Sequence, residues 1–156
     1  FRTNGLLLAV GPQSREDADG SLRGRLAALS KSHPGLFALR DFSTDILSYY
    51  QSADALILPS LKEGLPNVVL EAMACGLPCV AARASGSREL IREGETGYTY
   101  AHGDVTEMGE ALRRCLSAEG GRLGRNAREV AQTQYSIQVI ADRYEALYEQ
   151  LLMQHR

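Results

Sequence analysis

Short apolar runs alternate along the chain with longer segments that place apolar residues on one side at helical spacing. Runs of the first kind, which have the composition of buried strands, lie at 5–10, 36–39, 55–58, 77–82 and 97–100. Segments of the second kind, which predict helices, lie at 22–32, 44–52, 65–75, 87–93, 105–117, 122–133 and 137–153. This alternation, with no internal repeat, predicts an α/β fold with a Rossmann-like parallel sheet flanked by helices. We expect residues 1–156 to form a single domain.

Three local features complete the predicted fold. Ser21 is placed to cap the helix at 22–32. The glycine-rich segment 120–124 predicts a turn between two helices rather than a dinucleotide-binding loop. The last helix carries an apolar stripe that we expect to pack against the rest of the domain, with a partner-binding groove as the alternative. The stripe consists of Ile137, Ile140, Tyr144, Leu147, Tyr148 and Leu151.

The central strand–helix–strand unit contains an isolated charge. Between positions 68 and 82, Glu71 is the only charged residue in an otherwise apolar run. In a buried helix such a carboxylate costs several kcal/mol unless it is hydrogen-bonded. Glu63 stands eight positions earlier, in the loop that leads into the same helix. Because Glu71 lies about five residues into this helix, ~7–8 Å along its axis, the two acids can reach opposite ends of one ligand.

The residues between the two acids favour an anion. Gly64 allows close backbone approach, and the first N–H groups of the helix, near Asn67 and Val68, form an anion site. Acids on both sides of such a site suit a ligand with hydroxyls at each end and phosphate between them, as in a nucleotide-sugar. The residues alone leave open that Glu63 is a solvated loop residue and that Glu71 pairs with an arginine for packing.

The run from Pro59 to Pro78, PSLKEGLPNVVLEAMACGLP, resembles the signature of retaining GT-B glycosyltransferases of the family 4 (group 1) type. The resemblance implies that Glu63 contacts the donor sugar and is the catalytic residue, and that Glu71 holds the ribose of the nucleotide. It also implies that the backbone of Gly64, Leu65, Pro66, Asn67 and Val68 binds the sugar and the phosphates of the donor.

The resemblance extends from residue 5 to residue 98, with departures. The family usually has glycine after the strand at 36–39, where this chain has Arg40 and Asp41, so the loop that we expect to meet the nucleobase differs. The first strand and helix of the family's C-terminal domain, with an Arg and a Lys for the pyrophosphate, have no counterpart here. Lys62 and Arg88 are the nearest candidates for the phosphates, with solvated surface charges as the alternative.

The implied function is that of a donor-binding domain, the C-terminal half of a GT-B glycosyltransferase. It transfers a hexose-type sugar from a nucleoside-diphosphate sugar to an acceptor with retention, without a metal or other cofactor. The N-terminal acceptor domain is absent from this chain, so we expect no turnover by the chain alone. A GT-B sugar phosphorylase, a nucleotide-sugar epimerase and a non-catalytic sugar-nucleotide binding or interaction module are the alternatives.

The charge and the apolar runs of the chain argue against nucleic acid as a partner and against a membrane-spanning helix. A net charge of −2 gives no basic field for nucleic acid. No apolar run reaches the ~20 residues of a membrane helix. The family resemblance implies a cytoplasmic protein in polysaccharide biosynthesis, with peripheral contact to the inner membrane face through the missing half. The chain begins with Phe1, which suggests a piece of a longer protein.

Other candidate sites are weak. Asp17 and Asp19 form a D-x-D pattern in a polar loop, which we interpret as a solvated loop rather than a metal site. Cys75, Cys79 and Cys115 are interpreted as small core residues in a reducing compartment.

Overall fold

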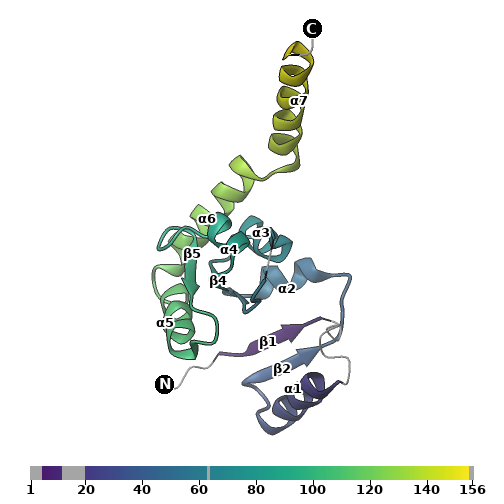
Figure 1. Ribbon diagram of the computed structural model, residues 1–156. Helices are drawn as coiled ribbons and strands as arrows, with labels where there is room; N and C mark the ends of the chain where they lie inside the picture. Colours follow the sequence, from purple (N-terminus) through teal and green to yellow (C-terminus); the bar gives the residue numbers. More distant parts are fainter. Residues whose placement is uncertain (1–4, 12–19, 63, 155–156) are drawn as a thin grey trace. The chain divides into compact units, whose positions relative to one another are not determined.

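The computed structural model describes residues 5–11, 20–62 and 64–154 (Figure 1). The chain divides into two compact units, a first unit of residues 1–46 and a second unit of residues 47–156. The elements, in chain order, are β1 (Leu7–Val10), α1 (Ser21–Ser32), β2 (Phe37–Arg40), α2 (Ile46–Ser52), β3 (Leu56–Leu58), α3 (Asn67–Ala74), β4 (Cys79–Ala82), α4 (Ser85–Leu90), β5 (Gly97–Tyr100), α5 (Val105–Cys115), α6 (Gly120–Gln134) and α7 (Ile137–Gln154). Strands and helices alternate as predicted, and every strand pair is parallel, which confirms the α/β class.

The first unit contains a two-stranded parallel sheet. β1 pairs with β2 from Leu7 opposite Phe37 onward, and α1 packs on β2, where Phe37 is buried. The prediction of a buried first strand is wrong for this unit, because Leu7 remains 51% exposed beside a single partner strand. Ser21 is not the cap of α1 but its first residue. Gly20 takes the cap position with a left-handed φ of 71°, which glycine adopts without steric cost.

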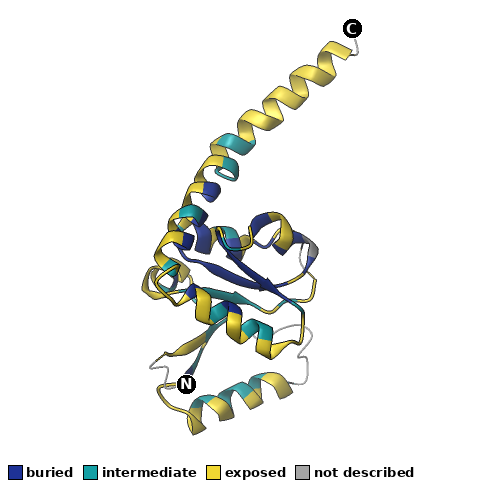
Figure 2. Ribbon diagram, turned by 90° about the vertical axis from the view of Figure 1, so that its left-hand side faces the viewer, coloured by how far each residue is buried: buried dark blue, intermediate teal, exposed yellow. Residues whose placement is uncertain are grey.

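The second unit is built around β4, the middle strand of a parallel sheet ordered β3-β4-β5. Successive side chains of a strand point to opposite faces, and all four residues of β4 are buried (Figure 2). Cys79 and Ala81 face a core formed with α3 and α6, whereas Val80 and Ala82 face a core formed with α5. Helices therefore cover both faces of this sheet, as the continuous apolar run of β4 predicts.

Helix α3 ends where the sequence predicts. Gly76 follows it with a φ of 81°, and its N–H donates to the carbonyl of Met73 at 2.9 Å. The N–H of Leu77 donates to the carbonyl of Ala72 at 3.0 Å, which completes a Schellman motif. At the other end the helix begins at Asn67 rather than at the predicted residue 65.

The glycine-rich segment 120–124 is not the predicted turn but the first part of α6. A Cβ atom on Gly124 would lie 2.0 Å from the carbonyl oxygen of Gly76, so α6 approaches the end of α3 at a distance that only glycine permits. Gly124 in this segment therefore serves close helix packing.

The predicted packing of the last helix against the domain is wrong. α7 contacts α6, yet none of its described side chains is buried, and Ile137 is 87% exposed (Figure 2). Both faces of the sheet in the second unit are already covered by α3, α6 and α5, so this unit leaves no sheet face for α7. Among the described residues, no helix combines the length and the hydropathy that crossing a membrane requires.

The contact between Gly124 and Gly76 yields a stability prediction. We expect Gly124→Ala to lower the free energy of unfolding by about 1–3 kcal/mol, because the added methyl group meets backbone that cannot rotate away. Gly121→Ala is the matched control on the same helix, since its Cβ would meet only the end of Arg125 at 3.6 Å. It should be neutral or stabilise by about 0.5–1 kcal/mol. Urea unfolding followed by circular dichroism measures both, and equal effects of the two variants would contradict the assigned packing.

Candidate functional site

The start of α3 lies open in the second unit. Pro66 occupies the cap position and is buried, whereas Asn67 and Val68 are exposed. Proline has no side-chain acceptor, and no described side chain caps this helix. The first N–H groups of a helix also lack intrahelical acceptors, so the amides of Asn67 and Val68 are placed as donors at the positive end of the helix dipole. The predicted anion site at this position stays a prediction.

Glu71 lies on the exposed side of α3 and not in a buried helix, which corrects the sequence-based argument. The buried side of α3 consists of Val69, Ala72 and Met73. Glu71 stands one turn after Asn67, so helical periodicity places both on the side away from this core. The carboxylate is therefore solvated, and it lies about 6 Å along the axis from the first helical residue, at 1.5 Å per residue.

The carboxylate of Glu71 has a specific partner. The hydroxyl of Tyr50, on α2, donates a hydrogen bond to Oε2 of Glu71 at 2.9 Å. Tyr50 is only 7% exposed and belongs to the core of α3 and α6. Burial raises the pKa of Tyr50, and the hydrogen bond to Glu71 raises it further, so the phenol remains a proton donor at any physiological pH. Among the residues that the structure describes, the observed partner of Glu71 is thus a tyrosine and not an arginine.

The sequence analysis did not identify Tyr50 as a site residue. It stands 21 positions before Glu71, and a tyrosine at an inward position of a short helix has the same pattern as an ordinary core aromatic. Only the packing of α2 shows that its hydroxyl meets the carboxylate.

The other residues predicted in the loop before α3 are placed in part. Glu63, the predicted catalytic residue, lies outside the described residues. Lys62, Gly64 and Leu65 are exposed. They lie near the start of α3 because they directly precede it in the sequence.

Arg40 and Asp41 belong to the first unit. Arg40 is the last residue of β2 rather than part of the loop after it, and its guanidinium donates to the carbonyl of Leu39 at 3.2 Å. Asp41 forms an ion pair with Arg23 of α1, which also donates to the carbonyl of Gly11 at 3.4 Å. The structure therefore brings these residues together where β1 and β2 end, the edge at which parallel sheets bind ligands.

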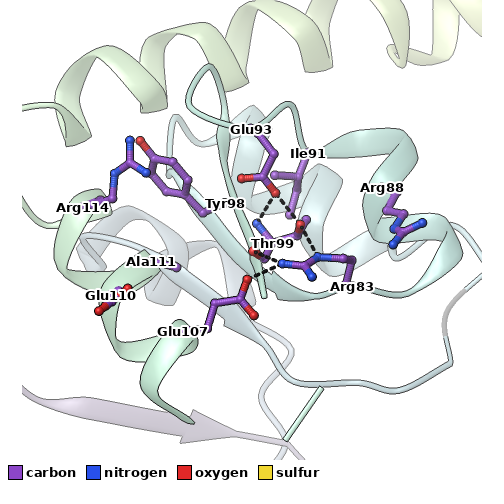
Figure 3. Close-up of a pocket in the computed structure, with 10 residues that line it drawn as sticks. All are labelled: Arg83, Arg88, Ile91, Glu93, Tyr98, Thr99, Glu107, Glu110, Ala111 and Arg114. Atoms are coloured by element: carbon purple, nitrogen blue, oxygen red, sulfur yellow. Dashed lines mark hydrogen bonds and ion pairs between the residues drawn. The ribbon is translucent and has the colours of Figure 1, made fainter. Parts of the chain in front are cut away.

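A separate cavity of about 570 Å³ lies beside β5 in the second unit (Figure 3). Of the predicted site residues, Arg88 is the one found among its described lining residues. The lining mixes both signs of charge and consists of Arg83, Arg88, Ile91, Glu93, Tyr98, Thr99, Glu107, Glu110, Ala111 and Arg114.

Several of these charged groups bond to strand β5 rather than facing a ligand. Glu93 accepts from the N–H of Thr99 at 2.8 Å and from its hydroxyl, and Glu107 accepts from the N–H of Ala101. Arg83 forms an ion pair with Glu107 and donates to the carbonyl of Thr99 (Figure 3). Edge strands expose unpaired backbone groups. These side chains satisfy them, which is a sufficient structural reason for the cluster.

In the described part of the chain, the cysteines and the potential metal ligands form no second site. Cys79 and Cys115 are buried, and Cys75 is half-buried. Burial raises the pKa of Cys79, and it raises the pKa of Cys115 to about 11, so both thiols stay protonated. Within residues 5–11, 20–62 and 64–154, no group of three or more His, Cys, Asp and Glu side chains could hold a metal ion. Asp17 and Asp19 lie outside these ranges.

Comparisons with known proteins agree on one family. Residues 4–118 match the family described as glycosyl transferases group 1. The chain is 37% identical to N-acetyl-alpha-D-glucosaminyl L-malate synthase of Bacillus anthracis over 102 residues, which are 64% of this chain and 27% of the synthase. The chain thus spans about a quarter of the length of this relative.

Two solved structures show the same fold. Sucrose-phosphate synthase from Thermosynechococcus elongatus superposes with a TM-score of 0.79 at 30% identity, over 96% of this chain and 39% of the synthase. Anabaena HepE in complex with UDP-glucose superposes with a TM-score of 0.77 at 23% identity, over 92% of this chain and 41% of HepE. The second similarity concerns the fold alone.

The polar contacts around β5 give a prediction that separates structure from ligand binding. We expect Glu93→Ala to lower the free energy of unfolding by about 1–2 kcal/mol, because it leaves the N–H of buried Thr99 without its acceptor. Glu110→Ala is the matched control, an exposed acid that lines the same cavity. Its effect should stay within about 0.5 kcal/mol. Thermal and urea unfolding measure both, and two equally stable variants would contradict the structural role of Glu93.

Proposed function

Because the chain belongs to the group 1 glycosyltransferases, the family that residues 4–118 match, we propose that it binds the donor in a sugar-transfer reaction. The donor is a nucleoside-diphosphate sugar, the transferred group is a hexose-type sugar, and the configuration at the anomeric carbon is retained. The α/β fold with parallel strands is the one that the GT-B glycosyltransferases share. We also propose that residues 1–156 act as one donor-binding domain.

The observation that carries the proposal is the arrangement at the start of α3. An anchored, exposed carboxylate, Glu71, stands about one turn from helix amides that no described side chain caps. Ribose hydroxyls can donate to the carboxylate, and a diphosphate can accept from the amides of Asn67 and Val68. The distance of about 6 Å between the two features suits adjacent parts of one nucleotide.

The leaving group in this reaction is the nucleoside diphosphate, on which negative charge develops as the glycosidic bond breaks. The amides and dipole at the start of α3 stabilise that charge without a metal ion. Lys62, exposed in the adjoining loop, supplies a cation to the same region. Arg88 is the weaker of the two candidates, because it lines the cavity beside β5.

Glu63 acts on the sugar in this proposal. It directly precedes Gly64, so its carboxylate belongs to the loop that meets the donor sugar. There it orients the ring and favours positive charge at the anomeric carbon. The acceptor attacks from the face that the diphosphate leaves, which retains configuration. Glu71 is then a positioning residue and not a base.

The nucleobase and the acceptor are the remaining partners in this proposal. We propose that Arg40 and Asp41 approach the nucleobase, and that an N-terminal domain of the same enzyme binds the acceptor, with peripheral membrane contact. HepE, which shares the fold, was crystallised with UDP-glucose, so the fold accommodates a donor of this class.

Nucleotide titration tests the donor-binding assignment. We expect UDP or GDP to bind the wild-type chain in isothermal titration calorimetry. We expect Glu71→Ala to weaken that binding at least tenfold, because hydrogen bonds to a charged group contribute about 1.5–3 kcal/mol. Glu145→Ala, an exposed acid on α7, is the control and should leave the affinity unchanged. Equal affinities of wild type and Glu71→Ala would remove the ribose assignment. A chain that binds neither nucleotide would point to a non-catalytic module.

Turnover tests the role of Glu63. In the complete enzyme we expect Glu63→Ala to reduce kcat by two or more orders of magnitude while nucleotide affinity changes by less than about threefold, because the carboxylate acts on the sugar in the transition state. The isolated 156 residues should transfer no sugar, since the acceptor side of the cleft is lacking. Transfer by this chain alone, or a loss confined to nucleotide affinity, would contradict the assignment.

A further inference from the structure

The contact between Tyr50 and Glu71 joins two different environments. The ring of Tyr50 is part of a core that includes Val69 and Met73, whereas Glu71 is exposed. Their hydrogen bond, 2.9 Å long, therefore ties a surface carboxylate to a rigid interior. An exposed glutamate otherwise samples several rotamers, and fixing such a side chain costs up to about 1.5–2 kcal/mol. A carboxylate that is already held avoids this cost when a ligand binds.

Once Tyr50 and Glu71 are hydrogen-bonded to each other, the pair can only accept further hydrogen bonds. A tyrosine hydroxyl has one proton, and Tyr50 donates it to Oε2 of Glu71. Oε1, the second lone pair of Oε2 and the phenol oxygen then remain as acceptors. The pair offers no donor of its own, so it is complementary to a group with two adjacent donors, such as a vicinal diol.

We propose that Tyr50 is a positioning residue that fixes the Glu71 carboxylate to accept hydrogen bonds from both ribose hydroxyls of the donor, and thereby selects ribonucleotides over 2′-deoxyribonucleotides. This inference rests on the proposed function, since it names how the same site recognises its nucleotide. The buried position of the ring supports it, because the hydroxyl is held at 2.9 Å from Oε2 of Glu71, and a phenol whose pKa is raised keeps its proton throughout the physiological range.

A purely structural role for the contact between Tyr50 and Glu71 makes a different prediction. A buried tyrosine needs a hydrogen-bond partner for its hydroxyl, and Glu71 satisfies that need. In that case Tyr50→Phe changes stability alone. In the proposed case the variant, which keeps the ring and the packing, alters ligand discrimination.

Calorimetry with four nucleotides distinguishes these roles. The wild-type chain should bind UDP or GDP at least tenfold more tightly than the corresponding 2′-deoxy nucleotide, dUDP or dGDP. Tyr50→Phe should weaken binding of the ribonucleotide about fivefold to tenfold and remove most of the preference. It should have no effect on affinity in a Glu71→Ala background. Tyr49→Phe, at the neighbouring half-buried tyrosine, is the matched control and should change neither affinity nor preference. An unchanged preference in Tyr50→Phe would overturn the inference.

A measurement without ligand separates this inference from the proposed function. Three-bond NMR couplings to Cγ of Glu71 should report one χ1 rotamer in the wild type and in Tyr49→Phe, and averaged rotamers in Tyr50→Phe. Averaged couplings in the wild type, or a single rotamer in Tyr50→Phe, would overturn the positioning role even if UDP binds. A chain that binds no nucleoside diphosphate overturns the proposed function and the ribose selection with it, whatever the couplings show.

Discussion

One hydrogen bond, from a buried tyrosine to an exposed glutamate, connects the core of the second unit to its candidate binding surface. Glu71 stands on the solvent side of α3, so its carboxylate would be mobile without the Tyr50 hydroxyl. Tyr50 in turn is fixed by a core that α3 and α6 build against β4. The absence of a side chain at Gly124 lets α6 approach Gly76, at the end of α3, this closely. Packing far from the surface thus determines where one carboxylate points.

Much of the fold could be predicted from the sequence, because its local signals agree with its packing. β4 is a continuous apolar run with both faces covered, and Gly76 ends α3 in the left-handed conformation that glycine favours. The predictions fail where the same residue type is compatible with two different structures. Glycines at 120–124 read as a turn but permit close helix contact, and the apolar stripe of α7 does not specify what covers it.

The candidate site could be predicted in part. The spacing of Asn67, Val68 and Glu71 predicts that they lie near the start of one helix, as observed. The match to the group 1 glycosyltransferases confirms the family that the residues around this helix indicate. The prediction of a buried Glu71 is wrong, because an apolar run does not show which helix side its one polar residue occupies. Tyr50 was missed because contacts between residues 21 positions apart depend on tertiary packing. The roles of Glu63, Lys62, Arg40, Asp41 and Arg88 stay predictions.

The central claim is that this carboxylate and the neighbouring helix start receive the nucleotide of a sugar donor. A crystal structure of the chain with bound UDP-glucose tests it most directly. The account predicts ribose hydroxyls about 2.6–3.2 Å from the carboxylate of Glu71, with the Tyr50 contact kept and a phosphate at the amides of Asn67 and Val68. A nucleotide bound in the cavity beside β5, or a ribose that does not touch Glu71, would contradict it.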